Sequence, residues 1–163
     1  MPSRALIASV ALLCLTACGR IQLDPQRPAD FDLTGTWVLV EEASEAPPST
    51  RRLRSRGGML AFIIQDFPVL RAREMRIEPS GDSMGVRYIP GGYRDVSWGT
   101  RTRGLWEVRA GWHEGSLVIL SVADDARARE TLTLSADGRR LDVAVRIDAR
   151  GEDLDVVRVF RRP

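Results

Sequence analysis

The feature that most constrains this chain is residues 130–148, ETLTLSADGRRLDVAVRID, where apolar side chains occupy every second position on both sides of a turn. Leu132 alternates with threonines before the turn, and Leu141 and Ile147 bound a similar alternation after it. Because successive side chains of a strand point to opposite faces, this spacing is typical of strands with one buried face. The segment therefore predicts an antiparallel hairpin that turns at Asp137-Gly138.

Similar hairpin patterns follow one another from Arg71 to the end of the chain. They are REMRIEPSGDSMGVRY, YRDVSW, GLWEVRAGWHEGSLVILSVA with a turn at residues 113–115, and a final LDVVRVFRR. An earlier run, LTGTWVLVEE, supplies a first strand, and the total is eight or nine strands. A meander of this kind avoids exposed edges by rolling up. We expect a mainly β fold over residues 33–163, as one antiparallel barrel or strongly curved sheet.

Residues 49–67 interrupt the strand pattern after the first strand. A short helix is expected over residues 51–56, and apolar side chains at helical spacing follow over residues 59–67 until Pro68. The run MLAFII, residues 59–64, is also compatible with a buried strand, since periodicity cannot decide so short a segment. We favour the helix, which would form a short lid on the sheet.

The amino terminus has the layout of a secretory signal peptide. Arg4 precedes an apolar run over residues 5–15, which is shorter than the about 20 residues that a transmembrane helix needs. The small residues that follow suit cleavage by a signal peptidase. We predict that residues 1–17 are removed, that residues 18–32 form a tether, and that one domain follows.

The residues Leu15-Thr16-Ala17-Cys18 resemble the lipobox of bacterial lipoproteins. In that family the lipobox cysteine is acylated and becomes the first residue of the mature chain. The resemblance implies lipidation at Cys18 and attachment to a membrane, because several acyl chains anchor a protein stably. Gly19 at the next position resembles the pattern of lipoproteins sent to the outer membrane, on its periplasmic face.

Composition excludes several kinds of site. All 24 cationic residues are arginine, a bias that we ascribe to the base composition of the genome. They are nearly balanced by 22 acidic residues, so nothing demands a nucleic-acid partner. Cys14 would leave with the signal peptide, so a disulfide or redox pair is not expected. His113 is the only histidine, so we predict no metal site and no cofactor. Neither a Gly-rich phosphate loop nor a nucleophile elbow is present, and we do not expect an enzyme.

The order of elements is similar to that of the calycin group, which holds the lipocalins and the fatty-acid-binding proteins. The similarity rests on Gly35-Thr36-Trp37 in the first strand, a helical pair, a series of hairpins, and Arg158-Val159-Phe160 in the last strand. Fatty-acid-binding proteins carry Arg-x-Tyr there, which holds a ligand carboxylate. The resemblance implies ligand contacts from Arg158, Phe160 and Trp37, although Phe160 lacks the tyrosine hydroxyl.

Two arginine features each leave an alternative open. Arg158 shares its strand face with Leu154, Val156 and Phe160, and an inward Arg158 needs a carboxylate or an anionic ligand. In the other orientation, Val157 and Val159 point inward and Arg158 is in water. Four arginines that precede the apolar helical run could contact an anionic membrane or could form a solvated face: Arg51, Arg52, Arg54 and Arg56.

Two functions follow as hypotheses. The first is a lipid-anchored periplasmic module that binds a hydrophobic or amphipathic small molecule without catalysis. The second is an envelope structural or assembly protein with a filled interior and no ligand, since a small barrel can fill itself with side chains. Trp98, Trp106 and Trp112 are expected in the core or at an interface under either hypothesis.

Overall fold

The computed structural model describes residues 21–49, 51, 53 and 58–163. Cys18, the predicted signal peptide, and three of the four clustered arginines, Arg52, Arg54 and Arg56, lie outside the described residues. Predictions about them stay predictions.

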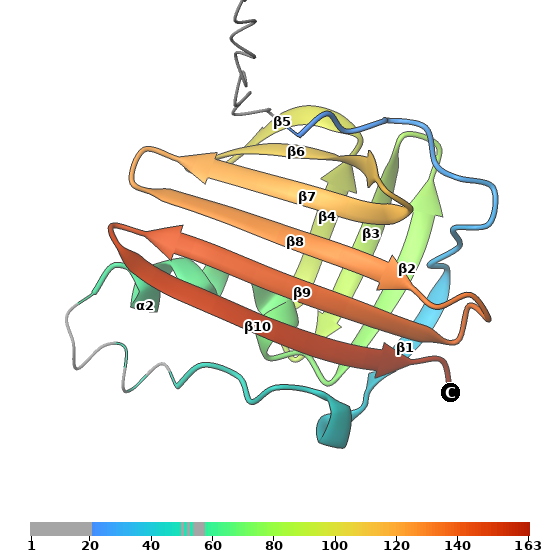
Figure 1. The fold of residues 1–163 in the computed structure, drawn as a ribbon, viewed down its shortest axis with the longest axis horizontal. Helices are drawn as coiled ribbons and strands as arrows, with labels where there is room; N and C mark the ends of the chain where they lie inside the picture. Colours follow the sequence, from blue (N-terminus) through green and yellow to red (C-terminus); the bar gives the residue numbers. More distant parts are fainter. Residues whose placement is uncertain (1–20, 50, 52, 54–57) are drawn as a thin grey trace, which may run out of the picture.

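Ten antiparallel strands form one sheet that rolls into a nearly closed barrel. The strands are β1 (Gly35–Leu39), β2 (Glu74–Ser80), β3 (Ser83–Ile89), β4 (Gly92–Ser97), β5 (Gly99–Arg103), β6 (Trp106–His113), β7 (Ser116–Ala123), β8 (Ala126–Leu134), β9 (Arg140–Ala149) and β10 (Glu152–Arg161). Their order is β4-β3-β2-β1-β10-β9-β8-β7-β6-β5, so the first and last strands pair and the edges are β4 and β5. Figure 1 shows β6 to β10 at the front, with β2 to β4 crossing behind them.

The predicted fold class is confirmed, with one more strand than the upper expected number. The additional strand is β5, GTRTR, which has no apolar residue and whose first four residues are exposed. Hydrophobic alternation cannot reveal a strand with no buried face. The expected hairpin turn at Asp137-Gly138 is present, and Gly138 there has a φ of +68°, which glycine adopts readily.

Short helices lie between β1 and β2, and the helical region from residue 60 onward was predicted. The helices are η1 (Glu41–Ala43), α2 (Leu60–Ile63), η2 (Ile64–Asp66) and η3 (Pro68–Leu70). The apolar run at residues 59–64 is therefore helical and not a strand. Glu41 and Glu42 were expected in the first strand, but β1 ends at Leu39 and both belong to a 3₁₀ helix. Most of the helix expected over residues 51–56 lies outside the described residues.

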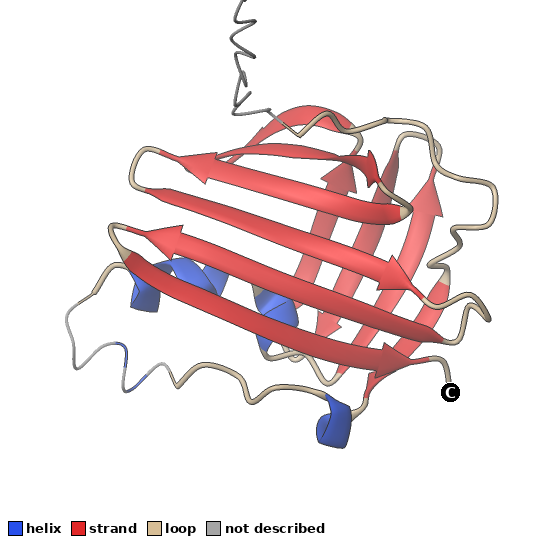
Figure 2. Ribbon diagram, in the orientation of Figure 1, coloured by secondary structure: helices blue, strands red, loops and turns tan. Residues whose placement is uncertain are grey.

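Pro68 does not end the helical region but begins η3, where proline suits the first turn. Figure 2 shows α2 near the turn between β9 and β10, and we call α2 and η2 together the lid.

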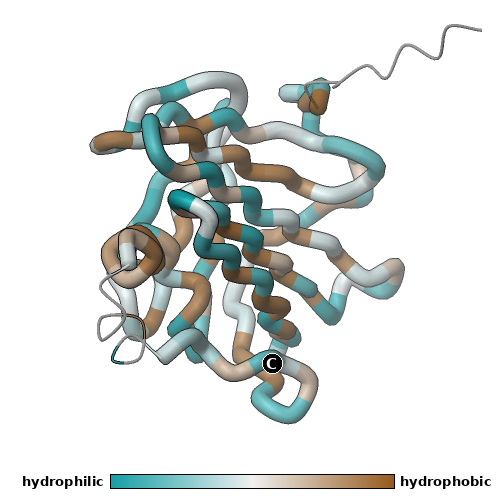
Figure 3. Tube along the Cα trace, turned by 60° about the vertical axis from the view of Figure 1, so that its left-hand side comes forward, coloured by the Kyte–Doolittle hydropathy of each residue, from teal (hydrophilic) through white to brown (hydrophobic). Residues whose placement is uncertain are grey.

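Side-chain size along the front strands differs between the two ends of the barrel. Near the lid, Ala123 is paired with Ala126, which is paired with Ala149. At the opposite end, the same face carries Trp112 opposite Leu117, which is opposite Leu132. Figure 3 shows the hydropathy alternation along the strands that separates this inner face from the outer one. The barrel is thus packed with large side chains far from the lid and with small ones beneath it.

The segment before β1, predicted as a tether, lies along the barrel over its described part. Asp24 exchanges two backbone hydrogen bonds with Trp112, at 2.9 and 2.7 Å. Gly111 permits this approach, because a Cβ there would lie 2.7 Å from the Asp24 carbonyl oxygen. Phe31 is buried and packs edge-on against Trp112, and Leu33 is also buried. Residues 21–33 therefore close the end of the barrel opposite the lid.

Candidate functional site: a pocket beneath the lid

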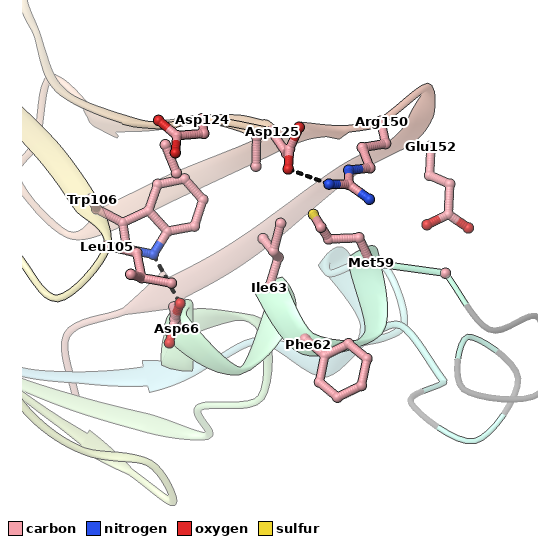
Figure 4. Close-up of a pocket in the computed structure, with 13 residues that line it drawn as sticks. Met59, Phe62, Ile63, Asp66, Leu105, Trp106, Asp124, Asp125, Arg150 and Glu152 are labelled. Atoms are coloured by element: carbon pink, nitrogen blue, oxygen red, sulfur yellow. Dashed lines mark hydrogen bonds and ion pairs between the residues drawn. The ribbon is translucent and has the colours of Figure 1, made fainter.

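A pocket of about 730 Å³ lies between α2 and the turns that connect the front strands. Its apolar lining comes from Met59, Phe62, Ile63, Leu105, Trp106, Ala123 and Ala126. In Figure 4, Met59, which precedes α2, and Ile63 of α2 project toward the β7–β8 turn, whereas Phe62 projects from the other side of the helix. Phe62 and Leu105 are 68 % and 90 % exposed, which is unusual for large apolar side chains. The size and apolar lining suit a small hydrophobic molecule.

Two hydrogen bonds hold the lid over this pocket. The Glu152 side chain, beside the β9–β10 turn, accepts a hydrogen bond from the Leu60 backbone N–H at 3.2 Å. At the other end of the lid, Trp106 Nε1 donates to the Asp66 carboxylate at 2.8 Å (Figure 4). The Trp106 ring also meets Phe67 edge-on, with ring centroids 5.6 Å apart. The lid is therefore attached to both walls of the pocket.

The polar part of the pocket lining is acidic. It holds four carboxylates, from Asp66, Asp124, Asp125 and Glu152, and one guanidinium, from Arg150. Arg150 forms an ion pair with Asp125, and its hydrogen bond holds the pKa of that carboxyl below the ordinary value. The pocket entrance therefore carries an excess of negative charge.

A buried ion pair crosses the barrel interior below this pocket. Arg94 Nη1 of β4 lies 2.6 Å from Glu130 Oε1 of β8, and the two residues are 6 % and 1 % exposed. Burial alone lowers the pKa of Arg94, but Glu130 and Tyr88 outweigh it, so that pKa is raised. Burial also raises the pKa of Tyr88 to about 12. Arg94 thus stays charged beside the Glu130 side chain, and the half-buried Arg103 interacts electrostatically with both residues.

Two buried polar atoms, one in this pair and one on β7, have no hydrogen-bond partner among the described residues. They are Arg94 Nη2 and Ser121 Oγ, both fully buried. Ser121 is paired with Ala128 across β7 and β8, and Glu130 follows on the same face of β8. Ser121 therefore lies in the register between the alanines of the pocket and the buried pair.

The structure resolves the direction of Arg158. Its side chain points inward on the face of Val156 and Phe160 and is 4 % exposed. Nη1 donates to the Glu45 carbonyl at 2.7 Å and Nη2 to the Ala72 carbonyl at 3.4 Å. Burial lowers the pKa of Arg158, with an opposing contribution from Glu41. Arg158 also lines a separate pocket of about 340 Å³, between residues 39–47 and 71–73.

The other two predicted ligand contacts belong to the packed core. Phe160 and Trp37 are fully buried, and neither lines the pocket beneath the lid. Trp37 Nε1 donates to the Leu33 carbonyl at 2.8 Å, and the Arg162 guanidinium lies 4.6 Å from its ring centre. That contact lies near the β8–β9 turn, at the end opposite the lid, because Arg162 also donates to the Gly138 carbonyl. Ligand contact by these residues stays a prediction.

Arg51 is the only one of the four clustered arginines that the structure describes, and it is exposed. No set of metal-ligating side chains is found among residues 21–49, 51, 53 and 58–163. Within the same residues no helix has the length and apolar character needed to cross a bilayer.

Comparison with known proteins finds similar structures but no similar sequence family. No protein family and no curated protein matches the sequence. Solved structures do match: the fluorescent protein UnaG has a TM-score of 0.54 and 17 % identity, over 80 % of this chain and 97 % of its own. Fatty-acid-binding protein 1 of Echinococcus granulosus has a TM-score of 0.52 and 12 % identity, over 80 % and 96 %. Human cRBP IV has a TM-score of 0.50 and 19 % identity, over 82 % and 99 %.

These neighbours confirm the predicted resemblance to the calycin group at the level of fold. At such identities the likeness concerns the fold alone. The buried polar residues of the interior, Arg94, Glu130 and Ser121, were not expected from the sequence. Glu130 does share its alternation with Ala128 and Leu132, which was the available signal for an inward carboxylate.

Proposed function

We propose that this chain binds a hydrophobic or amphipathic small molecule, without catalysis, in the pocket beneath the lid. The observation that carries the proposal is the apolar pocket of about 730 Å³ under a lid that hydrogen bonds attach at both ends. Structural neighbours with the same fold include proteins whose names describe fatty-acid binding. Burial of apolar ligand surface supplies affinity at about 25 cal/mol per Å².

The pocket, and not the deep interior, is the proposed site. Deeper in the barrel than the small residues under the lid, buried side chains such as Ile119 and Phe160 fill the inner face. A ligand in the pocket would contact Ile63 on the lid, Met59 just before it, and Ala123 on the opposite wall.

Displacement of Nile red by long-chain lipids tests this proposal. A form that begins at Gly19 keeps every described core residue, because the core runs from Phe31 to Phe160. In this form Ala123→Trp should fill the pocket and abolish binding. Val122→Trp is the matched control, since Val122 is the adjacent residue and is 43 % exposed. Equal binding by wild type and Ala123→Trp would exclude the pocket as the site.

We further propose that the molecule is anchored through an acylated Cys18 at the periplasmic face of the outer membrane. The lipobox resemblance of Leu15-Thr16-Ala17-Cys18 supports this location. Mass spectrometry of the mature chain should find Cys18 at the amino terminus with acyl groups attached. A Cys18→Ala chain should leave the membrane fraction. A free thiol at Cys18 in the mature wild-type protein would refute the anchor.

A second candidate function is assembly with another envelope protein. Two exposed apolar side chains at the pocket rim favour it, Phe62 and Leu105, which would dock against a partner. A photocrosslinker at position 105, introduced in cells, should then capture one envelope protein reproducibly. Failure of any lipid to displace Nile red from the wild type, together with such capture, would favour this function over ligand binding.

A further inference from the structure

A second pocket lies where β1 ends between β10 and β2. The Leu39 amide still donates to the Arg73 carbonyl, but the residues that follow donate hydrogen bonds to β10. The chain thereby opens a pocket of about 340 Å³ between residues 39–47 and 71–73, which we call the arginine pocket. It shares no lining residue with the pocket beneath the lid, and η1, which contributes to its wall, lies far along β10 from α2 (Figure 2). The two pockets are therefore separate.

Arg158 is the one buried residue among those that line the arginine pocket. It is 4 % exposed and takes part in none of the ion pairs between described residues. Two of its five N–H groups donate to the Glu45 and Ala72 carbonyls, and the buried Nε has no acceptor in the described part of the chain. A buried charge is costly unless an opposite charge and hydrogen bonds compensate it. Arg158 therefore has the charge and the donors to hold an anion.

The charged side chains that line the arginine pocket leave one positive charge in excess. They are three guanidinium groups, from Arg71, Arg73 and Arg158, and two carboxylates, from Glu41 and Glu45. Both carboxylates already have partners: Glu41 lies 3.8 Å from Arg73, and Glu45 accepts a hydrogen bond from a backbone N–H of β10 at 2.7 Å. Beside the lining, Glu74 pairs with Arg76 and adds no net charge. The pocket thus matches one anionic group.

We propose that the arginine pocket binds an oxyanion, the carboxylate or phosphate group of a small polar molecule, with Arg158 as its principal contact. The planar guanidinium fork suits the paired oxygens of either group. The pocket has less than half the volume of the pocket beneath the lid, so we expect a short ligand and not a long-chain lipid. The proposal is independent of ligand binding beneath the lid.

An NMR titration of the chain that begins at Gly19 tests the proposal, with sodium phosphate in one series and sodium acetate in the other. Sodium chloride keeps the ionic strength constant, because added salt screens exposed charges. At least one of the two anions should shift the Arg158 Nε–Hε resonance and the Ala46 amide resonance saturably, with a Kd of about 1 mM or lower. The anion that binds more tightly identifies the group that the pocket prefers. Chloride alone should give no saturable shift.

Two pairs of variants, with binding measured at the Ala46 amide, locate the anion. Arg158→Gln should weaken binding about tenfold or more, whereas Arg161→Gln, at an exposed position of the same strand, removes the same charge and should change the Kd less than about twofold. Glu41→Gln should tighten binding about threefold, because it removes a carboxylate from the lining. Glu42→Gln is its control, since Glu42 is exposed, adjoins Glu41 and does not line the pocket.

Failure of both anions to give a saturable shift would overturn the proposal, as would equal weakening by Arg158→Gln and Arg161→Gln. If Arg158→Gln does not fold, the second pair decides, and equal affinities of Glu41→Gln and Glu42→Gln would overturn it. Ala123→Trp, which fills the pocket beneath the lid, should leave anion binding unchanged. Loss of anion binding in that variant would place the anion beneath the lid and refute a separate site.

Discussion

The buried pair Arg94–Glu130 makes a strong prediction about stability. Its side chains are 4 % and 2 % exposed, and the two charged atoms lie 2.6 Å apart. Glu130→Leu leaves the Arg94 charge buried without its carboxylate, and loss of one partner of such a pair costs about 3–5 kcal/mol. With an m-value of about 2 kcal/mol/M, the urea midpoint should fall by about 2 M.

The double variant Arg94→Leu/Glu130→Leu should recover most of that loss. It removes both charges, and replacement of a buried pair by apolar side chains is often neutral or stabilising. Urea unfolding of the four chains, monitored by circular dichroism, gives the coupling free energy of the double-mutant cycle. Additive effects of the two single variants, with a double variant less stable than either, would refute this account of the interior.

Three other predictions concern separate parts of the barrel. Because the folded pKa of Tyr88 is about 12 against an ordinary value of 10.0, the unfolded chain loses its proton first. Stability should therefore fall by up to about 3 kcal/mol as the pH rises from 10 to 12, and a Tyr88→Phe chain with the same alkaline loss would contradict this. Trp106→Phe removes the hydrogen bond to Asp66 and should speed proteolysis of residues 58–71, whereas Asp66→Asn keeps an acceptor oxygen and should not. Equal cleavage rates of the two variants would argue that this hydrogen bond does not hold the lid. Gly111→Val should displace Asp24 and reduce hydrogen-exchange protection of the Trp112 amide, and unchanged protection would refute the close packing.

The sequence predicted the strands in which one face is buried and the other is exposed to solvent. The β8–β9 hairpin and its turn at Asp137-Gly138 follow directly from alternation and turn chemistry. The strand β5 escaped prediction because it has no apolar residue and its first four residues are exposed, so it shows no hydrophobic alternation. The lid was predictable as helix from the spacing of Met59, Ile63 and their neighbours.

The site was predictable only in part, because its groups come together by barrel closure. Alternation left Arg158 undecided, since Val157 and Val159 offered a second apolar face. The structure shows why that face is apolar: Val159 exchanges hydrogen bonds with residues 40–44, which cover it. Arg94 and Glu130 are 36 residues apart in the chain, and no local pattern indicates that they meet.

The central claim is that a small hydrophobic molecule binds beneath the lid. The most direct measurement is a methyl NMR titration of the chain that begins at Gly19 with a long-chain alcohol. We expect saturable shifts at Met59, Ile63 and Ala126, which line the pocket, and none at Met84, which lines a small pocket at the opposite end. Shifts at Met84 without shifts at Met59 and Ile63, or no saturable shift at all, would contradict the claim.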